Sequence, residues 1–259
     1  MILDFLNILS LLAIFTGVIC LVDIIWCRIK KITIQKNSEY PMIIGYARSL
    51  FPILLTVLIV RSLLFQSYLV PTGSLEPTIM PGDFILVNQY DYGLYLPLWN
   101  KKFVNIGKPQ RGQIALIRWP VNPAVIFIKR VIGLPGDRIS YQNKVLYIND
   151  KKIPQTFIKD TLEVGDNDKT WKAKEYRENL DGIKYSVLHR SDCSTQNFKD
   201  LIVPKNKYFM MGDNRDDSDD SRSWGFVSAN NFIGRALFVW MSWNPHTHHV
   251  RWYRIGNGL

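Results

Sequence analysis

The sequence has little cysteine and lacks the familiar motifs of histidine-based and metal-based hydrolases. Only three of its 259 residues are cysteines, and Cys20 and Cys27 fall in or beside an apolar amino-terminal run. Cys193 is therefore alone in the rest of the chain, which must be held together by its core rather than by disulfides. The G-x-S-x-G, H-E-x-x-H, P-loop and G-x-G-x-x-G motifs are absent, and His189 has no persuasive triad setting. A serine nucleophile here would need a base other than histidine.

Acidic residues are also scarce relative to basic ones. There are 22 acidic and 32 basic side chains, which gives a net charge of +10. This excess suits an anionic partner, either a nucleic acid or a phospholipid surface. Part of the excess lies in a short segment between two apolar runs and the rest is spread over the remaining chain, which argues against a nucleic-acid partner. The basic residues of that segment are Arg28, Lys30, Lys31, Lys36 and Arg48.

The two apolar runs predict transmembrane helices. The first, residues 5–22, is uncharged and close to the length that crosses a bilayer. A cleavable targeting peptide is the alternative, but Asp4 precedes the run and bulky residues follow it. The second run, residues 49–70, contains Arg61, so a buried core helix is its alternative; an arginine about two turns from a helix end can still reach the interface.

The basic segment between the runs sets the expected topology. Under the positive-inside rule we expect a first transmembrane helix in residues 1–26, a cytoplasmic loop at 27–48 and a second helix at 49–70. Residues 71–259 then form an extracytoplasmic domain.

Short β-branched and aromatic runs separated by Gly, Pro, Asn and Asp dominate the chain after residue 83. They predict a mainly β protein with an antiparallel β-sheet. Residues 151–201 are more polar, so we expect a smaller inserted subdomain, β or irregular, that modulates the domain rather than carrying its chemistry. The tail holds His246, His248 and His249, but a solvated tail is favoured over a metal site.

Three segments carry residues suited to chemistry. PTGSLEPTIMPGD contains Ser74, although a serine in a turn is usually a turn residue. In AVIFIKRVIGLPGD, strand alternation gives Lys129 apolar neighbours that favour its neutral amine, although its head could instead reach solvent. The third, MGDNRDDSDDSRSWGFV, does not match a calcium loop; it is either a salt-bridged corner or a set of acid/base carboxylates.

Taken in order after two apolar runs, these segments closely resemble the signature boxes of bacterial type I signal peptidases, the serine/lysine peptidases of family S26. The resemblance implies that Ser74 is the nucleophile and that Lys129 is its unprotonated general base. It also implies that the Thr72 hydroxyl and the Ser74 backbone N–H form the oxyanion hole. Ser218 would orient the lysine amine, and Asp220 would form a supporting ion pair with Arg222.

The resemblance further implies an endopeptidase that cleaves signal peptides from exported preproteins after small residues, in an Ala-x-Ala pattern, through an acyl-enzyme. It implies no cofactor or metal, and its partners would be preproteins, the phospholipid membrane and, as an option, the secretion machinery. The expected location is the bacterial inner membrane, with a periplasmic catalytic domain. By analogy, the substrate pocket would be lined by Tyr68, Val70, Leu75, Ile79, Phe127 and Ile128.

Four positions depart from the family pattern. Thr72 replaces a common serine, Leu75 a common methionine, Gln113 an acid and Asp217 an asparagine. None of these changes removes a catalytic group, but a carboxylate at Asp217 would raise the pKa of Lys129 if it were unscreened. Two other functions stay open: another serine/lysine peptidase, and a membrane-anchored β module that binds peptides without catalysis.

Overall fold

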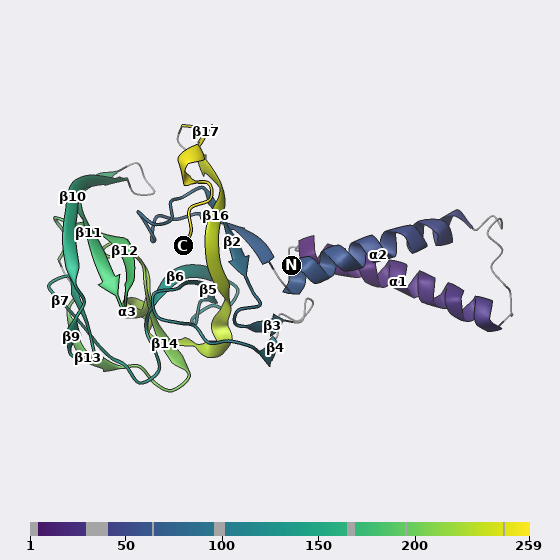
Figure 1. Ribbon diagram of the computed structural model, residues 1–259, viewed down its shortest axis with the longest axis horizontal. Coiled ribbons are helices and arrows are strands. Elements are labelled where there is room, and N and C mark those ends of the chain that lie inside the picture. Colours follow the sequence, from purple (N-terminus) through teal and green to yellow (C-terminus); the bar gives the residue numbers. More distant parts are fainter. Residues whose placement is uncertain are drawn as a thin grey trace. The chain divides into compact units, whose positions relative to one another are not determined.

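The computed structural model describes residues 5–29, 41–63, 65–95, 102–164, 169–194, 196–245 and 247–259. The chain forms two compact units. The first comprises residues 1–66 and 93–105, and the second comprises residues 67–92 and 106–259. The predicted mainly β, antiparallel architecture preceded by two apolar helices is confirmed (Figure 1).

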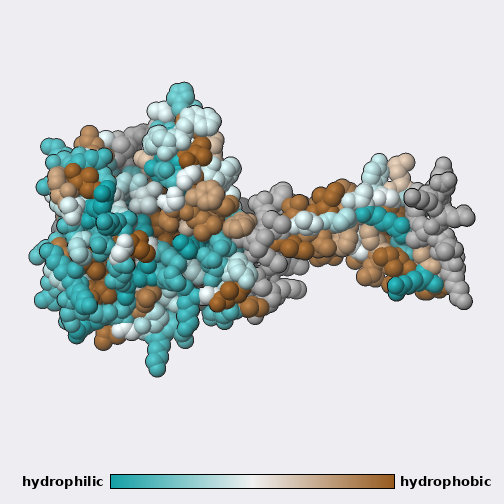
Figure 2. Space-filling view, in the orientation of Figure 1, coloured by the Kyte–Doolittle hydropathy of each residue, from teal (hydrophilic) through white to brown (hydrophobic). Residues whose placement is uncertain are grey.

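Two long helices, α1 (Phe5–Ile29) and α2 (Met42–Leu63), belong to the first unit. Both are long and apolar enough to cross a membrane. They pack closely: a Cβ added at Gly17 would lie 2.8 Å from the Phe51 ring, and Arg48 forms an ion pair with Asp23. Apolar side chains cover much of their described outer surface, as an apolar solvent permits (Figure 2). The strands β3 (Gly93–Tyr95) and β4 (Lys102–Asn105) form a hairpin in the same unit.

The second helix differs from the expected span of residues 49–70. It begins at Met42, directly after Pro41, and ends at Leu63. The expected carboxyl-terminal part instead forms strand β1 (Phe65–Leu69), which is hydrogen-bonded to strand β2 (Asp83–Asn88). Exposed and half-buried side chains alternate along β1, as in a strand. Half of the expected basic loop of residues 27–48, namely residues 30–40, lies outside the described residues.

The second unit is built on an eight-stranded sheet with the order β1-β2-β16-β5-β6-β14-β15, in which β17 also pairs with β16. Its described partners are antiparallel. Two apolar clusters pack against it, one around Ile85, Leu116 and Val239 and the other around Ile117, Val131 and Phe232. The strands not yet bounded are β5 (Ile114–Arg118), β6 (Ile126–Gly133), β14 (Lys207–Met211), β15 (Val227–Ser228), β16 (Phe232–Asn244) and β17 (His249–Val250).

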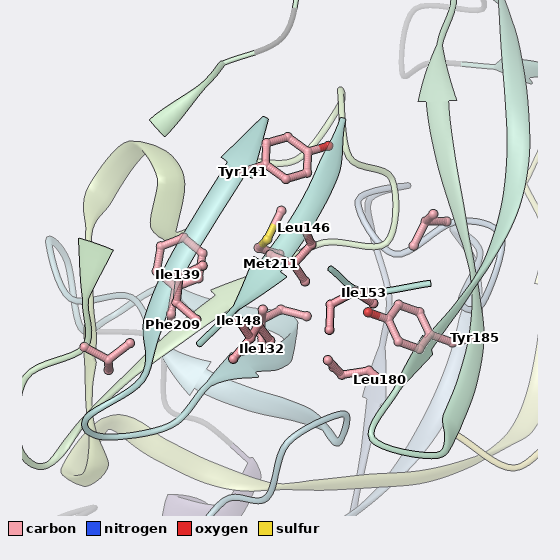
Figure 3. Close-up of a cluster of buried hydrophobic side chains, with 12 residues drawn as sticks. Ile132, Ile139, Tyr141, Leu146, Ile148, Ile153, Leu180, Tyr185, Phe209 and Met211 are labelled. Carbon is pink, nitrogen blue, oxygen red and sulfur yellow. The ribbon is translucent and has the colours of Figure 1, made fainter. Parts of the chain in front are cut away.

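Two smaller sheets complete this unit. One has the order β13-β7-β8-β9, and the other has the order β10-β11-β12. Figure 3 shows the third apolar cluster, where Ile139 and Leu146 meet Ile132, Tyr185 and Phe209 from other sheets. The strands are β7 (Arg138–Gln142), β8 (Val145–Ile148), β9 (Lys151–Lys152), β10 (Gln155–Val164), β11 (Thr170–Leu180), β12 (Ile183–Arg190) and β13 (Phe198–Ile202).

The segment 151–201 is therefore more regular than expected. Its long strands β10, β11 and β12 form an antiparallel sheet, and β9 and β13 extend the other small sheet. Its polarity reflects exposed residues that alternate with buried ones such as Ala173 and Leu180. The remaining short helices are α3 (Ser221–Trp224), η1 (Ala229–Asn231) and η2 (Trp252–Arg254).

Candidate active site

Ser74 lies in a closed loop between β1 and β2. The loop is closed at its base, where the Val70 N–H donates to the Asp83 carbonyl at 2.9 Å and the Gly82 N–H donates to the Val70 carbonyl at 2.9 Å. Leu75 and Ile79 are fully buried in the neighbouring apolar cluster and hold the loop down. Ser74 itself remains half-buried, so its hydroxyl sits on an anchored segment with access to solvent.

Lys129 reaches Ser74 from strand β6, where its backbone lies opposite Ala115 of β5. The Lys129 Nζ atom is 2.5 Å from Ser74 Oγ, which is a short hydrogen bond. The lysine is only 4% exposed, and its amine lies 5.5 Å from the centre of the Phe127 ring. The sequence interpretation that this lysine is buried among apolar neighbours is therefore consistent with its position, and the alternative of a solvent-exposed head is wrong.

Burial lowers the pKa of the Lys129 amine from 10.5 to about 8. The charges of Asp220 and Asp219, and more weakly of Asp213, raise the pKa, and Arg222 lowers it. Within the described part of the chain, no carboxylate forms a salt bridge with Nζ, so desolvation outweighs these attractions. The neutral amine is thus well populated near pH 8.

A second loop, residues 212–222, supports the dyad from the other side. The Asn214 N–H donates to the Ser74 carbonyl at 3.1 Å. Gly212 packs so tightly that an added Cβ would lie 2.3 Å from the Ser74 carbonyl oxygen and 2.2 Å from Ser218 Oγ. A side chain at Gly212 would therefore displace either the nucleophile's backbone or Ser218.

Asp220 and Arg222 form the expected ion pair. The Arg222 guanidinium donates two hydrogen bonds of 2.8 Å to the Asp220 carboxylate, which also accepts the Gly212 N–H at 3.0 Å and caps α3. Burial raises the pKa of Asp220, but the Arg222 hydrogen bond and charge outweigh it, so the pKa is lowered overall. The pair fixes the glycine that contacts both Ser74 and Ser218.

Similarity to known proteins identifies the family of this chain. The model of the family "Signal peptidase, peptidase S26" matches residues 43–243. The chain belongs to the signal peptidase family. It is 38% identical over 242 residues to a signal peptidase I of Pseudomonas fluorescens, an alignment that covers 87% of this chain and 82% of the relative. It is also 38% identical over 225 residues to a signal peptidase I of Pseudomonas aeruginosa, covering 81% and 76% of the two chains.

A solved signal peptidase I from Enterococcus faecalis V583 is similar over 51% of this chain and 98% of its own, with 30% identity and a TM-score of 0.34.

The two groups expected to donate hydrogen bonds to the oxyanion are the Thr72 hydroxyl and the Ser74 backbone N–H. Thr72 is exposed, and neither its hydroxyl nor the Ser74 N–H donates to an acceptor among the described residues. Ser218 Oγ is buried and likewise has no hydrogen-bond partner there. The structure thus brings Ser218 against Gly212 but shows no bond from it to Lys129, and its orienting role stays a prediction.

The six residues expected to line the substrate pocket divide into two groups. Val70, Leu75 and Ile79 are buried in one apolar cluster, with Tyr68 and Ile128 packed against it. Phe127 instead packs against the cluster that contains Val131 and Phe232. In this structure Leu75 and Ile79 act as loop anchors, because their side chains are fully buried. Contact of any of the six with substrate stays a prediction.

The carboxylate of Asp217 is screened by an arginine, so the condition under which it would raise the pKa of Lys129 is not met. Its side chain is 48% exposed and forms an ion pair with Arg190 at 2.7 Å. The largest carboxylate effects on the pKa of Lys129 come from Asp220, Asp219 and Asp213 instead. Gln113 bonds to Gln110 and to the Tyr92 hydroxyl, so it braces a turn.

Sequence reasoning missed Asp213, which joins both dyad segments to the supporting loop. Its carboxylate accepts two hydrogen bonds from Arg130, at 2.6 and 2.7 Å, and one from the Thr78 hydroxyl at 2.6 Å. Arg130 is the neighbour of Lys129, and Thr78 follows Ser74 by four residues. Asp213 and Arg130 both lie inside segments that the sequence had already singled out, but nothing in the sequence showed that the two charges pair.

The described residues contain no group of three or more His, Cys, Asp or Glu side chains that could hold a metal ion. His248 and His249 lie in or beside the short strand β17, and His246 is outside the described residues.

Proposed function

We propose that this chain is a membrane-bound signal peptidase that cleaves preproteins after small residues, with Ser74 as nucleophile and Lys129 as general base. The observation that carries the proposal is the 2.5 Å contact between Ser74 Oγ and a buried lysine amine, whose pKa burial lowers to about 8. A peptide-binding β module has no use for a desolvated lysine held against a serine hydroxyl. Family membership supports the same reaction.

The reaction follows from these groups. The neutral Lys129 amine takes the Ser74 proton as Oγ attacks the scissile carbonyl. The resulting ammonium gives that proton to the leaving amine, and the carbonyl carbon remains bonded to Ser74 as an ester. Water then attacks the ester, Lys129 accepts the water proton, and the proton returns to Ser74 Oγ when the acid is released.

The free donors at Thr72 and Ser74 are suited to the tetrahedral intermediate. The hydroxyl of Thr72 and the N–H of Ser74 would donate to the oxyanion, each donor contributing about 3 kcal/mol. Threonine retains the O–H that a serine at this position would supply. Shallow apolar surfaces beside the dyad would admit alanine and reject larger side chains by overpacking.

The proposed setting is the bacterial inner membrane, with the catalytic unit on the periplasmic side. Two helices of sufficient length and apolarity, and the basic residues of the sequence between them, support this orientation. The proposed partners are preproteins and phospholipid, with the secretion machinery as a further candidate. The role of residues 151–201 as a discrete inserted subdomain belongs to the same proposal.

Cleavage of a preprotein with an Ala-x-Ala signal by the detergent-solubilised chain tests the function. We expect the native chain to cut after the second alanine and Ser74→Ala and Lys129→Ala to be inactive. Lys152→Ala is the matched control, because Lys152 is an exposed lysine on β9. Inactivity of the native chain beside an active reference peptidase would favour the peptide-binding module, and activity of Lys129→Ala would show that another group is the base.

A further inference from the structure

A cavity of about 540 Å³ lies beside both dyad segments and is not used by the proposed reaction. One wall comes from the β11–β12 hairpin. The opposite wall includes Thr78, from the loop that carries Ser74, and Arg130, the neighbour of Lys129. The volume falls within the range of about 300–1,000 Å³ that is typical of small-ligand sites.

The hairpin wall presents two cations without partners. The side chains of Arg177 and Lys184 are exposed, and neither side chain forms a hydrogen bond or ion pair with any described residue. Arg177 lies opposite Ser186, and Lys184 lies opposite Asn179, so the two cations are diagonal neighbours on one face of the hairpin. Such positions are about 7–8 Å apart, which long side chains bridge easily. Both cations can therefore reach a single anion, and Ser186, directly opposite Arg177, is a further hydroxyl donor on the same face.

The remaining wall is also rich in donors. Arg130 donates to Asp213 twice and to the Gly112 carbonyl once, and a guanidinium has about five N–H donors. Arg235 is 40% exposed, and its only described carboxylate partner is Asp91 at 3.9 Å. Glu175, on the hairpin wall, is the one acidic side chain that lines the cavity, and it lies 3.6 Å from Lys159. The lining therefore contains four cationic side chains and one acidic side chain.

We propose that this cavity binds a phosphate group, either on a lipid headgroup or on a small soluble phosphate. Phosphate offers several strong acceptor oxygens and up to two charges, which match a planar arginine fork combined with a lysine point charge. The oxygens of a tetrahedral phosphate point in different directions, so one phosphate can accept from Arg177, Lys184 and Ser186 together. The proposal concerns binding and does not depend on the peptidase reaction.

Calorimetric titration of the full chain with inorganic phosphate, in neutral detergent at fixed ionic strength, tests this site. We expect saturable binding that weakens at least about tenfold in the double variant Arg177→Gln/Lys184→Gln. The control is Lys205→Gln/Lys207→Gln, which removes the same charge at exposed positions outside the cavity. All four side chains are exposed, so both variants should retain the native melting temperature.

The source of the phosphate is distinguished by reconstituting the native chain in vesicles. If the anionic headgroup of a lipid fills the site, phosphate binding should disappear in phosphatidylglycerol vesicles. It should persist in phosphatidylcholine vesicles, because the choline cation neutralises that headgroup's phosphate. If the ligand is soluble, binding should persist in both. Absence of saturable binding by the native chain in detergent, or equal weakening in both double variants, would overturn the proposal.

Discussion

Two buried basic side chains in the same domain differ in their partners and in the direction of their pKa shifts. Arg215, fully buried in the supporting loop, donates to both oxygens of Glu178 and also contacts the Tyr185 hydroxyl. Lys129, almost as deeply buried, faces a serine hydroxyl and an aromatic ring. The charge of Glu178 keeps the pKa of Arg215 well above its usual value despite burial, whereas burial lowers that of Lys129 to about 8. A buried basic side chain can serve as a base here when no carboxylate pairs with it, because burial then favours its neutral form.

The paired cations also attach the β10–β12 sheet to the supporting loop. Glu178 holds Arg215 and, on the neighbouring edge, Glu163 holds Arg190 and Asn214. The Leu188 N–H donates to the Asp213 carbonyl, and the Arg215 N–H donates to the Leu188 carbonyl. The segment that we expected to modulate the domain is therefore part of the frame that holds the site.

Removing the unpaired cation should have the largest effect on catalysis and little effect on stability. We expect Lys129→Met to lower kcat/KM by at least about 10³-fold, since the general base is lost. The melting temperature should stay the same or rise, because an apolar side chain of similar length replaces a desolvated amine. Steady-state kinetics and thermal melts of Lys129→Met and the exposed control Lys152→Met check this, and a large loss of stability in Lys129→Met would contradict it.

Removing the carboxylate partner of a buried cation should instead lower the stability of the fold. Glu178→Gln leaves the Arg215 charge buried without compensation, so we expect a loss of about 3–5 kcal/mol in the free energy of unfolding. Glu175→Gln is the control on the same strand, because its pair with exposed Lys159 should contribute no more than about 1 kcal/mol. Urea unfolding monitored by tryptophan fluorescence measures both variants. Equal losses in the free energy of unfolding would contradict the claim that Arg215 needs Glu178 to compensate its buried charge.

The pH dependence of activity should report the unpaired lysine. The amine is protonated and inactive below its pKa, so kcat/KM should rise with pH to a plateau, with a midpoint near pH 8. One unit below the midpoint, activity should be roughly a tenth of the plateau. Burial, reinforced by Glu163, raises the pKa of Glu76 to about 7, so Glu76→Gln serves as the control. If the midpoint moves in Glu76→Gln, the pH dependence reports Glu76 and not Lys129, which would contradict this prediction.

A smaller effect is expected at Ser218, whose hydroxyl is buried beside Gly212. If Ser218 orients the Lys129 amine during turnover, Ser218→Ala should lower kcat by up to about tenfold and leave KM unchanged, as the loss of one hydrogen bond implies. Ser223→Ala, in the same region but bonded to Asp219, is the control. Equal kinetics of native, Ser218→Ala and Ser223→Ala would remove Ser218 from the mechanism.

The smallest effect should come from Asp217. Because its carboxylate is half exposed and paired with Arg190, Asp217→Asn should change kcat/KM by less than about twofold and leave the pH midpoint in place. A clear downward shift of the midpoint would show that Asp217 does act on Lys129, as its position in the sequence had suggested.

The sequence predicted the parts of the fold and site that depend on local pattern. The long apolar runs predicted both helices and alternation predicted the strands. The apolar neighbours of Lys129 favoured a neutral amine but left a solvent-exposed head open. The end of the second helix was wrong because the apolar run SLLFQSYLV suits either a helix or a half-buried strand, and only pairing with β2 decides between them. The Glu178–Arg215 and Asp213–Arg130 pairs join distant segments, so no local pattern shows which charges meet.

The most direct test of the account is an NMR titration of the Lys129 amine itself. The full chain, labelled at the lysine side-chain nitrogens and solubilised in detergent, would be titrated between neutral and alkaline pH, with Lys129→Met used to assign the resonance. The account predicts a midpoint near pH 8 that is distinct from the other lysines. A midpoint at the ordinary value of about 10.5 would contradict it, because the amine would then be too fully protonated near neutral pH to serve as the base.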